Sequence, residues 1–179
     1  MEFKVLCVGD VVGNPGLDRV RRHLRQLKRK TGADFVVVNG ENAAVVGMTP
    51  RQGEEILDAG ADVITMGNHT FGKQDVLRLF ETENNILRPA NYPGSVPGNG
   101  YTIADCMGYR VLVINLLGCV YMESLASPFE VAERILRELK GKYDVSLIDI
   151  HAEATSEKIA FAHHFDGRIN IVFGTHTHV

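Results

Sequence analysis

The sequence lacks any apolar run long enough to cross a bilayer. The longest run, residues 111–122, is interrupted by Asn115 and Gly118 and falls short of the roughly 20 residues that a membrane helix needs. The N-terminal residues also lack a basic segment followed by an apolar segment and a cleavage site, the pattern of a secretory signal. We therefore expect no membrane attachment and a cytoplasmic location.

Cysteine and concentrated positive charge are also scarce. Cys7, Cys106 and Cys119 lie far apart and form no metal-type pair, so we expect them to be reduced and mostly buried. The 19 Lys and Arg residues are balanced by 22 Asp and Glu residues, a net charge of −3. Proteins that bind duplexes usually carry a basic patch, so this balance argues against a dedicated nucleic-acid surface. A small anionic substrate remains compatible with it.

Short apolar runs alternate with helical patterns along the chain. The 179 residues, 45% of them hydrophobic, predict one globular domain spanning residues 1–179. Strands buried on both faces are expected at residues 3–8, 35–39, 63–66, 111–115, 145–150 and 169–173. Apolar stripes indicate helices at residues 16–30 and from 128 onward, and a further helix is expected at residues 156–165. The alternation predicts a layered α/β domain.

Two helix starts and one long loop have clear local signals. Thr49-Pro50 and Ser127-Pro128 each combine a hydroxyl cap, a proline at the first helical position and a capping-box partner three residues after the cap. Residues 88–100 are rich in proline and glycine, so we expect a long loop there, of the kind that often carries function.

Metal-capable side chains follow five of the expected strands. They are Asp10, Glu41 and Asn42, Asn68 and His69, His151, and His176 and His178. Because sites in α/β proteins form outside the carboxyl ends of strands, these groups can converge. Gly9, Gly40, Gly67 and Gly174 precede them and allow sharp turns or close approach. In an extended tail, His176 and His178 would point to the same side.

This donor set exceeds the needs of one tetrahedral ion. Three histidines, two carboxylates and up to two amides predict two divalent metal ions per chain that share Glu41. Mixed nitrogen and oxygen ligands suit manganese, iron, zinc or cobalt better than calcium or magnesium, and ligand type alone does not choose among the four. The expected cofactors are iron or manganese, with zinc as an alternative. Two ions about 3.5–4 Å apart can hold a bridging hydroxide for attack on phosphorus.

Each residue taken alone also has an ordinary interpretation. Asp10 could be a turn residue, and Asn68 with His69 a capped turn. His163 and His164 point in different directions on an expected helix, so we interpret them as surface or packing residues. The spacing of Gly9, Gly13 and Gly16 does not fit a dinucleotide fingerprint. The joint placement of the polar groups favours the metal site.

The motifs resemble those of the calcineurin-like metallophosphoesterases, and most closely the YmdB-like branch, the 2′,3′-cyclic-nucleotide 2′-phosphodiesterases. They comprise residues 9–13 (GDVVG), 39–44 (NGENAA), 66–70 (MGNHT), 88–91 (RPAN), 151–158 (HAEATSEK) and 174–179 (GTHTHV). The resemblance implies a four-layer α/β/β/α sandwich. Relatives of this kind continue past the His-x-His motif, so we expect the later strands of the family to be absent from this chain.

The resemblance also implies roles for individual residues. Asp10, Glu41, Asn42 and His178 would hold one metal, whereas Glu41, Asn68, His151 and His176 would hold the other. His69 would be the general acid that protonates the departing ribose oxygen. Outside the resemblance, Asp149 either orients a histidine or is satisfied by backbone donors. Asn91, in the long loop, is our candidate for substrate binding.

The predicted function is phosphodiester hydrolysis by a metal-bridging hydroxide, with His69 as the acid. The resemblance implies that the substrates are 2′,3′-cyclic nucleotides and the products 3′-nucleotides. The alternative is a regulatory protein that binds metal and nucleotide but hydrolyses little. The expected partner is a small phosphodiester or cyclic nucleotide, and a homo-oligomer stays open.

Overall fold

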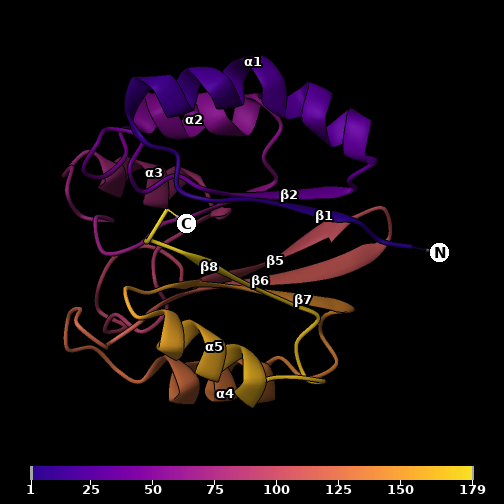
Figure 1. The fold of residues 1–179 in the computed structure, drawn as a ribbon, viewed down its shortest axis with the longest axis vertical. Helices are drawn as coiled ribbons and strands as arrows, with labels where there is room; N and C mark the ends of the chain where they lie inside the picture. Colours follow the sequence, from indigo (N-terminus) through magenta and orange to yellow (C-terminus); the bar gives the residue numbers. More distant parts are fainter. Residues whose placement is uncertain (1, 179) are drawn as a thin grey trace.

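Two four-stranded sheets lie face to face in the computed structural model, which describes residues 2–178. Helices cover the outer face of each sheet, so the layers follow the order helix, sheet, sheet, helix (Figure 1). The expected α/β/β/α sandwich is therefore confirmed.

The first sheet has the strand order β1-β2-β3-β4, and all its strands are parallel. The strands are Val5–Val8, Phe35–Asn39, Val63–Thr65 and Ile86–Leu87. The helices packed on this sheet are α1 (Gly13–Thr31), α2 (Pro50–Asp58) and α3 (Val76–Thr82).

The second sheet has the order β5-β6-β7-β8, in which only β5 is antiparallel to its neighbour. Its strands are Tyr101–Cys106, Tyr109–Leu117, Val145–His151 and Ile171–Thr175. The helices packed on it are α4 (Pro128–Glu138) and α5 (Thr155–His164). No helix within residues 2–178 is long and apolar enough to cross a membrane.

Alternation along each strand builds the core in three parts. In β2, Val36 and Val38 pack toward the helices, whereas Phe35 and Val37 pack against the second sheet. Successive side chains of a strand point to opposite faces, so a strand buried on both faces needs an uninterrupted apolar run. This requirement explains why the inner strands were recognisable in the sequence.

Parallel strand direction brings the carboxyl ends of β1, β2 and β3 to one edge of the first sheet. The carboxyl ends of β7 and β8 share the corresponding edge of the second sheet. Side chains cross between these two edges: Asn39 Nδ2 lies 3.0 Å from Asp149 Oδ2. The predicted functional residues therefore come from both sheets.

The six expected strands are all present, but β4 and β5 were not predicted. β4 has only two residues, and β5 is half-exposed along most of its length, so neither shows a continuous apolar run. Residues 88–100 form a loop with a single isolated bridge at Asn99, as expected. All three cysteines are free but only partly buried, which corrects the expectation that they are mostly buried.

The two expected helix caps differ in the structure. Thr49 forms a complete capping box with Gln52 at the start of α2. Ser127 precedes Pro128 at the start of α4 but makes no side-chain cap hydrogen bond. The proline alone defines that helix start, so the predicted capping box at Ser127 is wrong.

Thr49→Ala is expected to lower the free energy of unfolding by about 1 kcal/mol, because it removes the side-chain cap of α2. Ser127→Ala is the matched control and is expected to stay within about 0.5 kcal/mol of the parent protein. Urea denaturation followed by circular dichroism measures both values. Equal losses in the two variants would contradict the difference between the caps.

Candidate metal centre

The centre of the site is the carboxylate of Glu41, which follows β2 and is fully buried. Its Oε1 lies 3.1 Å from His151 Nε2 and 3.1 Å from Asn42 Nδ2. Its Oε2 accepts a hydrogen bond of 3.0 Å from the backbone amide of His69. A buried carboxylate is costly without such partners, and the partners of Glu41 come from both sheets.

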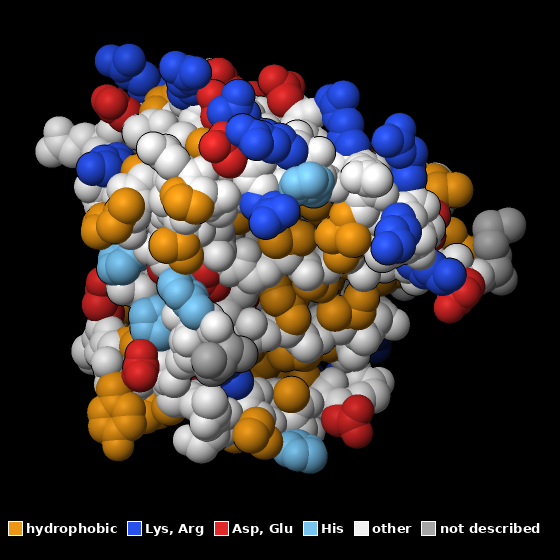
Figure 2. Space-filling model, turned by 45° about the horizontal axis from the view of Figure 1, so that its top comes forward, with side chains coloured by type: hydrophobic (Ala, Val, Ile, Leu, Met, Phe, Trp, Pro, Cys, Tyr) orange, Lys and Arg blue, Asp and Glu red, His pale blue; other side chains and the backbone are white. Residues whose placement is uncertain are grey.

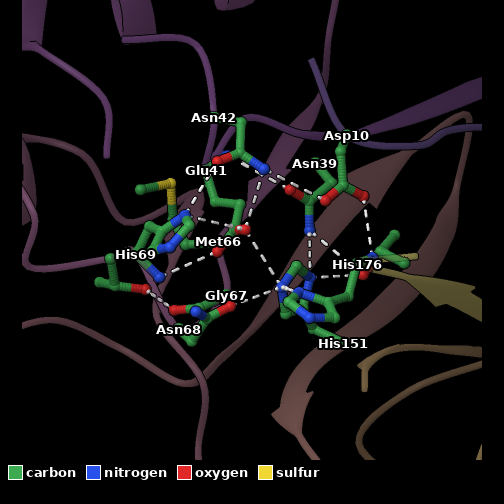
Figure 3. Close-up of polar contacts among 12 residues, drawn as sticks. Asp10, Asn39, Glu41, Asn42, Met66, Gly67, Asn68, His69, His151 and His176 are labelled. Atoms are coloured by element: carbon green, nitrogen blue, oxygen red, sulfur yellow. Dashed lines mark hydrogen bonds and ion pairs between the residues drawn. The ribbon is translucent and has the colours of Figure 1, made fainter. Parts of the chain in front are cut away.

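Three metal-capable atoms lie around the Nε2 atom of His151, which is the fourth (Figure 3). Besides Glu41 Oε1, Asn68 Oδ1 lies 3.1 Å away and His176 Nδ1 lies 3.0 Å away. Within residues 2–178, Glu41, His151 and His176 form the group of three whose ligand atoms all lie within 4.8 Å of one another. Mixed nitrogen and oxygen donors at such spacing suit a transition-metal ion.

A second group of polar atoms adjoins the first through Asp10. Asp10 Oδ2 lies 3.2 Å from His178 Nε2 and 3.5 Å from Asn42 Nδ2, and its Oδ1 accepts the backbone amide of His176 at 3.1 Å. The structure thus brings the seven predicted ligand positions into one contact network. In this arrangement Asn42 directs its amide nitrogen, rather than its oxygen, toward Asp10 and Glu41.

The two histidines of the His-x-His motif reach the site by a turn. β8 ends at Thr175, and His176 and His178 both adopt left-handed backbone conformations, with φ of 91° and 58°. The expected strand alternation is therefore wrong for this segment. Lys158 Nζ holds the turn by donating to the Thr175 carbonyl at 3.1 Å and to Thr177 Oγ1 at 2.9 Å.

His69 lies beside the cluster, and one of its two ring nitrogens makes a hydrogen bond to Asn42. Its Nδ1 is 2.9 Å from Asn42 Oδ1; because an amide oxygen only accepts, Nδ1 carries the proton of this hydrogen bond. Its side chain is 36% exposed, whereas those of Glu41 and His151 are fully buried. Nε2 of His69 is therefore the ring atom that remains for proton transfer.

A buried polar network under the site fixes the orientation of His151. Asp149 accepts hydrogen bonds from Asn39 Nδ2 at 3.0 Å, from Thr65 Oγ1, and from Thr175 Oγ1 at 2.7 Å. Thr175 Oγ1 also lies 2.8 Å from His151 Nδ1. Since the threonine proton goes to Asp149, His151 Nδ1 donates to the hydroxyl and leaves the Nε2 lone pair for the cluster.

This network resolves the two interpretations of Asp149. Side chains rather than backbone amides satisfy the carboxylate, and it reaches His151 through the Thr175 hydroxyl instead of directly. The contributions of Asn39, Thr65 and Thr175 were missed by the sequence analysis. The feature that could have indicated them is a polar residue at the end of an apolar strand. Asn39 and Thr65 end β2 and β3 in this way and are register partners.

The electrostatics of the site favour a cation. Burial opposes ionisation of Glu41, but the hydrogen bond and charge of His151 and the His69 amide hold the pKa of Glu41 below its usual value. Burial by itself lowers the pKa of His151, whereas Glu41, followed by Asp149 and Asp10, raises it above its usual value. Burial raises the pKa of Asp149 to about 6, despite the nearby His151 and three hydrogen bonds.

Gly67 provides a steric test of whether the cluster fits a metal. A Cβ atom at this position would lie 2.2 Å from Glu41 Oε2 and 2.4 Å from His151 Nε2. The backbone thus approaches the donor atoms as closely as only glycine allows. Around Gly9, by contrast, no atom of the described protein lies within 4 Å of such a Cβ, so the protein itself does not require glycine there. The donor chemistry and the Gly67 cradle together fit a bound ion.

Asn91 and three other histidines lie outside this cluster. The Asn91 amide is buried and binds backbone groups: Nδ2 donates to the carbonyls of Leu117 and Ala126, and Oδ1 accepts the amide of Leu117. These bonds hold residues 117–126 against the long loop and leave little of the side chain for a substrate. His23, His163 and His164 are exposed, in agreement with their interpretation as surface residues.

Comparisons of sequence and of structure show which known proteins this chain resembles. The family model described as "YmdB-like protein" matches residues 6–179. The "2′,3′-cyclic-nucleotide 2′-phosphodiesterase" of Bacillus subtilis is 42% identical over 99% of this chain and 67% of the relative.

Two crystal structures are also similar. A hypothetical protein from Thermus thermophilus has a TM-score of 0.90 and 41% identity, over 98% of this chain and 68% of that one. A phosphatase from Mycoplasma pneumoniae has a TM-score of 0.89 and 36% identity, over 99% of this chain and 65% of that one. The chain thus spans about two thirds of the length of the relatives it matches.

Thr175→Val is expected to weaken metal binding about 10- to 100-fold, because His151 loses the acceptor that fixes its orientation. Thr175→Ser keeps the hydroxyl and is expected to bind like the parent protein. Calorimetric titration of the metal-free protein with Mn²⁺ measures the affinities, and a cooperative thermal transition shows that each variant is folded. A folded valine variant with parental affinity would contradict this role for Thr175.

Proposed function

Because this chain belongs to the YmdB-like protein family, we propose that it is a metal-dependent phosphodiesterase that hydrolyses 2′,3′-cyclic nucleotides to 3′-nucleotides. The observation that carries this proposal is the cluster of Glu41, Asn68, His151 and His176, in which the other three donor atoms lie 3.0–3.1 Å from His151 Nε2. The name of the Bacillus subtilis relative supports the choice of substrate.

We propose two divalent ions per chain, with iron or manganese as the preferred metals and zinc as the alternative. Asp10, Glu41, Asn42 and His178 would hold one ion, and Glu41, Asn68, His151 and His176 the other. For Asn42 to serve as a ligand through oxygen, its amide must turn over, because the nitrogen now points to Asp10. Bound ions of this kind make water a stronger nucleophile and neutralise charge on phosphoryl oxygens.

His69 supplies the proton in this proposal. When the Asn42 amide has turned over, its nitrogen faces Nδ1 of His69 and orients the ring at the contact that its oxygen makes now. Nδ1 then accepts a hydrogen bond, so the ring proton lies on Nε2, which gives it to ribose O2′ as the bond between phosphorus and O2′ breaks. Water contributes the hydroxyl group that remains on phosphorus, its other proton passes to solvent, and solvent returns a proton to His69. The product is therefore a 3′-nucleotide. Histidine suits this step because its usual pKa lies near neutral pH.

Product analysis tests the proposal directly. Protein loaded with Mn²⁺ or Fe²⁺ is incubated with 2′,3′-cyclic AMP, and the products are separated by chromatography. We expect 3′-AMP, formed at a rate that follows metal occupancy. Occupied sites without product would overturn the enzymatic proposal and favour the alternative of a regulatory protein that binds metal and nucleotide.

Variants separate the proton donor from the metal ligands. His69→Ala is expected to keep its metal content but to lose about 10²- to 10⁴-fold in turnover, the usual contribution of a positioned acid. Asp10→Ala and His178→Ala are expected to lose metal, as measured by mass spectrometry of the bound ions. His23→Ala, which removes an exposed histidine on α1, is the matched control and should change neither quantity. Full turnover in His69→Ala would refute the acid role.

A further inference from the structure

Two exposed apolar loop tips flank the metal centre. On the side of the first sheet, Val45 is 65% exposed and Val46 43% exposed; on the side of the second sheet, Val120 is 42% exposed and Tyr121 90% exposed. Figure 2 shows hydrophobic side chains above and below a group of histidines. Tyr121 is the most exposed of the large apolar side chains within residues 2–178.

The first tip is tied to the residues around His69. The backbone amide of Val45 donates to the Asn42 carbonyl at 2.8 Å. A Cβ at Gly72 would lie 2.7 Å from Val46 Cγ1 and 3.1 Å from the His69 carbonyl. Val45 and Val46 therefore stand beside the proposed acid.

The second tip is held from both sides of Tyr121. On one side, the Glu157 carboxylate accepts the backbone amides of Cys119 at 2.9 Å and Val120 at 3.2 Å. Glu157 is itself buried, and hydrogen bonds to an ionised group are stronger than neutral ones. The segment just before the tyrosine is thus fixed to α5.

On the other side, the tip connects to the metal centre. Met122 Sδ accepts the backbone amide of Glu153 at 3.2 Å, and the Glu153 carboxylate lies 2.8 Å from His176 Nε2. Tyr121 is therefore linked to the proposed ligand His176 through two residues, its neighbour Met122 and Glu153. A fixed backbone on both sides presents the tyrosine ring to solvent next to the site.

Backbone strain is concentrated at the same place. Within residues 2–178, left-handed conformations occur at five residues that are not glycine: Val45, Met107, Tyr121, His176 and His178. Such conformations are costly for bulky side chains and cluster at functional sites. Two of the five are proposed ligands and two are the loop tips. The fifth, Met107, lies in the turn between β5 and β6, at the edge of the second sheet opposite to the metal centre.

Packing does not explain the strain at Tyr121. With 90% of the residue exposed, the ring gains little from the protein itself. A rigid, neutral aromatic face beside a phosphate-processing site matches a nucleobase, because every base can stack on an aromatic ring without a specific hydrogen-bond pattern. We propose that Tyr121 is a specificity-determining residue that stacks on the base of the nucleotide; this inference rests on the proposed function.

Tyr121→Ala isolates the ring from the backbone. Alanine keeps the Cβ atom, and with it the strain of the left-handed conformation, so only the aromatic surface is removed. Calorimetry with metal-loaded protein compares 3′-AMP with ribose 3-phosphate, which has no base. Tyr121→Ala is expected to weaken 3′-AMP binding by about 5- to 100-fold, the effect of losing one base–aromatic stack. The preference for 3′-AMP over ribose 3-phosphate falls by the same factor.

Two further variants complete the test. Tyr121→Phe keeps the ring and should retain the preference for 3′-AMP. Met107→Ala is the matched control, because Met107 is also 73% exposed with φ of 51°, and it should bind 3′-AMP as the parent protein does. Parental affinity for 3′-AMP in Tyr121→Ala, or no preference for 3′-AMP in the parent protein, would overturn the role of Tyr121.

The proposed function fails on a different observation. Parent protein that binds 3′-AMP but forms none from 2′,3′-cyclic AMP would refute hydrolysis. The binding measurements would still decide whether Tyr121 recognises a base, because they do not depend on turnover.

Discussion

The structure depends on the buried carboxylate of Glu41. A charge without solvent contact must be compensated by the protein, and here the compensation comes from both sheets: His151 from the second, and Asn42 with the His69 amide from the first. The two sheets must therefore stack in a register that brings β7 to the end of β2. The absence of a side chain at Gly67 lets the backbone pass within contact of the same carboxylate.

Beneath Glu41, a second buried carboxylate repeats this arrangement between the sheets. Asp149 takes hydrogen bonds from Asn39 and Thr65 of the first sheet and from Thr175 of the second. Strands β2, β3 and β8 thus end in a polar residue that binds Asp149, and Glu41, Asn68 and His176 follow one to three residues later. The positions of the donors are accordingly set by strands with rigid apolar cores.

Local rules predicted a layered α/β domain and the seven polar positions at the ends of strands, whereas the four-layer sandwich was implied by the family resemblance. An apolar run predicts a strand, and a polar residue after it lies at the carboxyl edge. The same rules could not predict Thr175, since nothing local distinguishes a threonine that binds His151 from one that merely ends β8. They also placed His176 and His178 on an extended tail, because a left-handed turn at a histidine leaves no clear pattern in the sequence. The short β4 and half-exposed β5 lacked an apolar run.

The two halves of the candidate site differ in burial and in the elements that carry their residues. His151 is the last residue of β7, whereas Glu41 and Asn68 lie in the turns after β2 and β3. The side chains of Glu41 and His151 are fully buried, and Asn68 is half-buried. His178, by contrast, is 46% exposed at the end of a turn and meets Asp10 at 3.2 Å. That turn is fixed by Lys158 and by the contact between His176 and Glu153, both supplied by α5 or the segment before it. The α5 region therefore supports the outer half of the site, as the sheet interior supports the inner half.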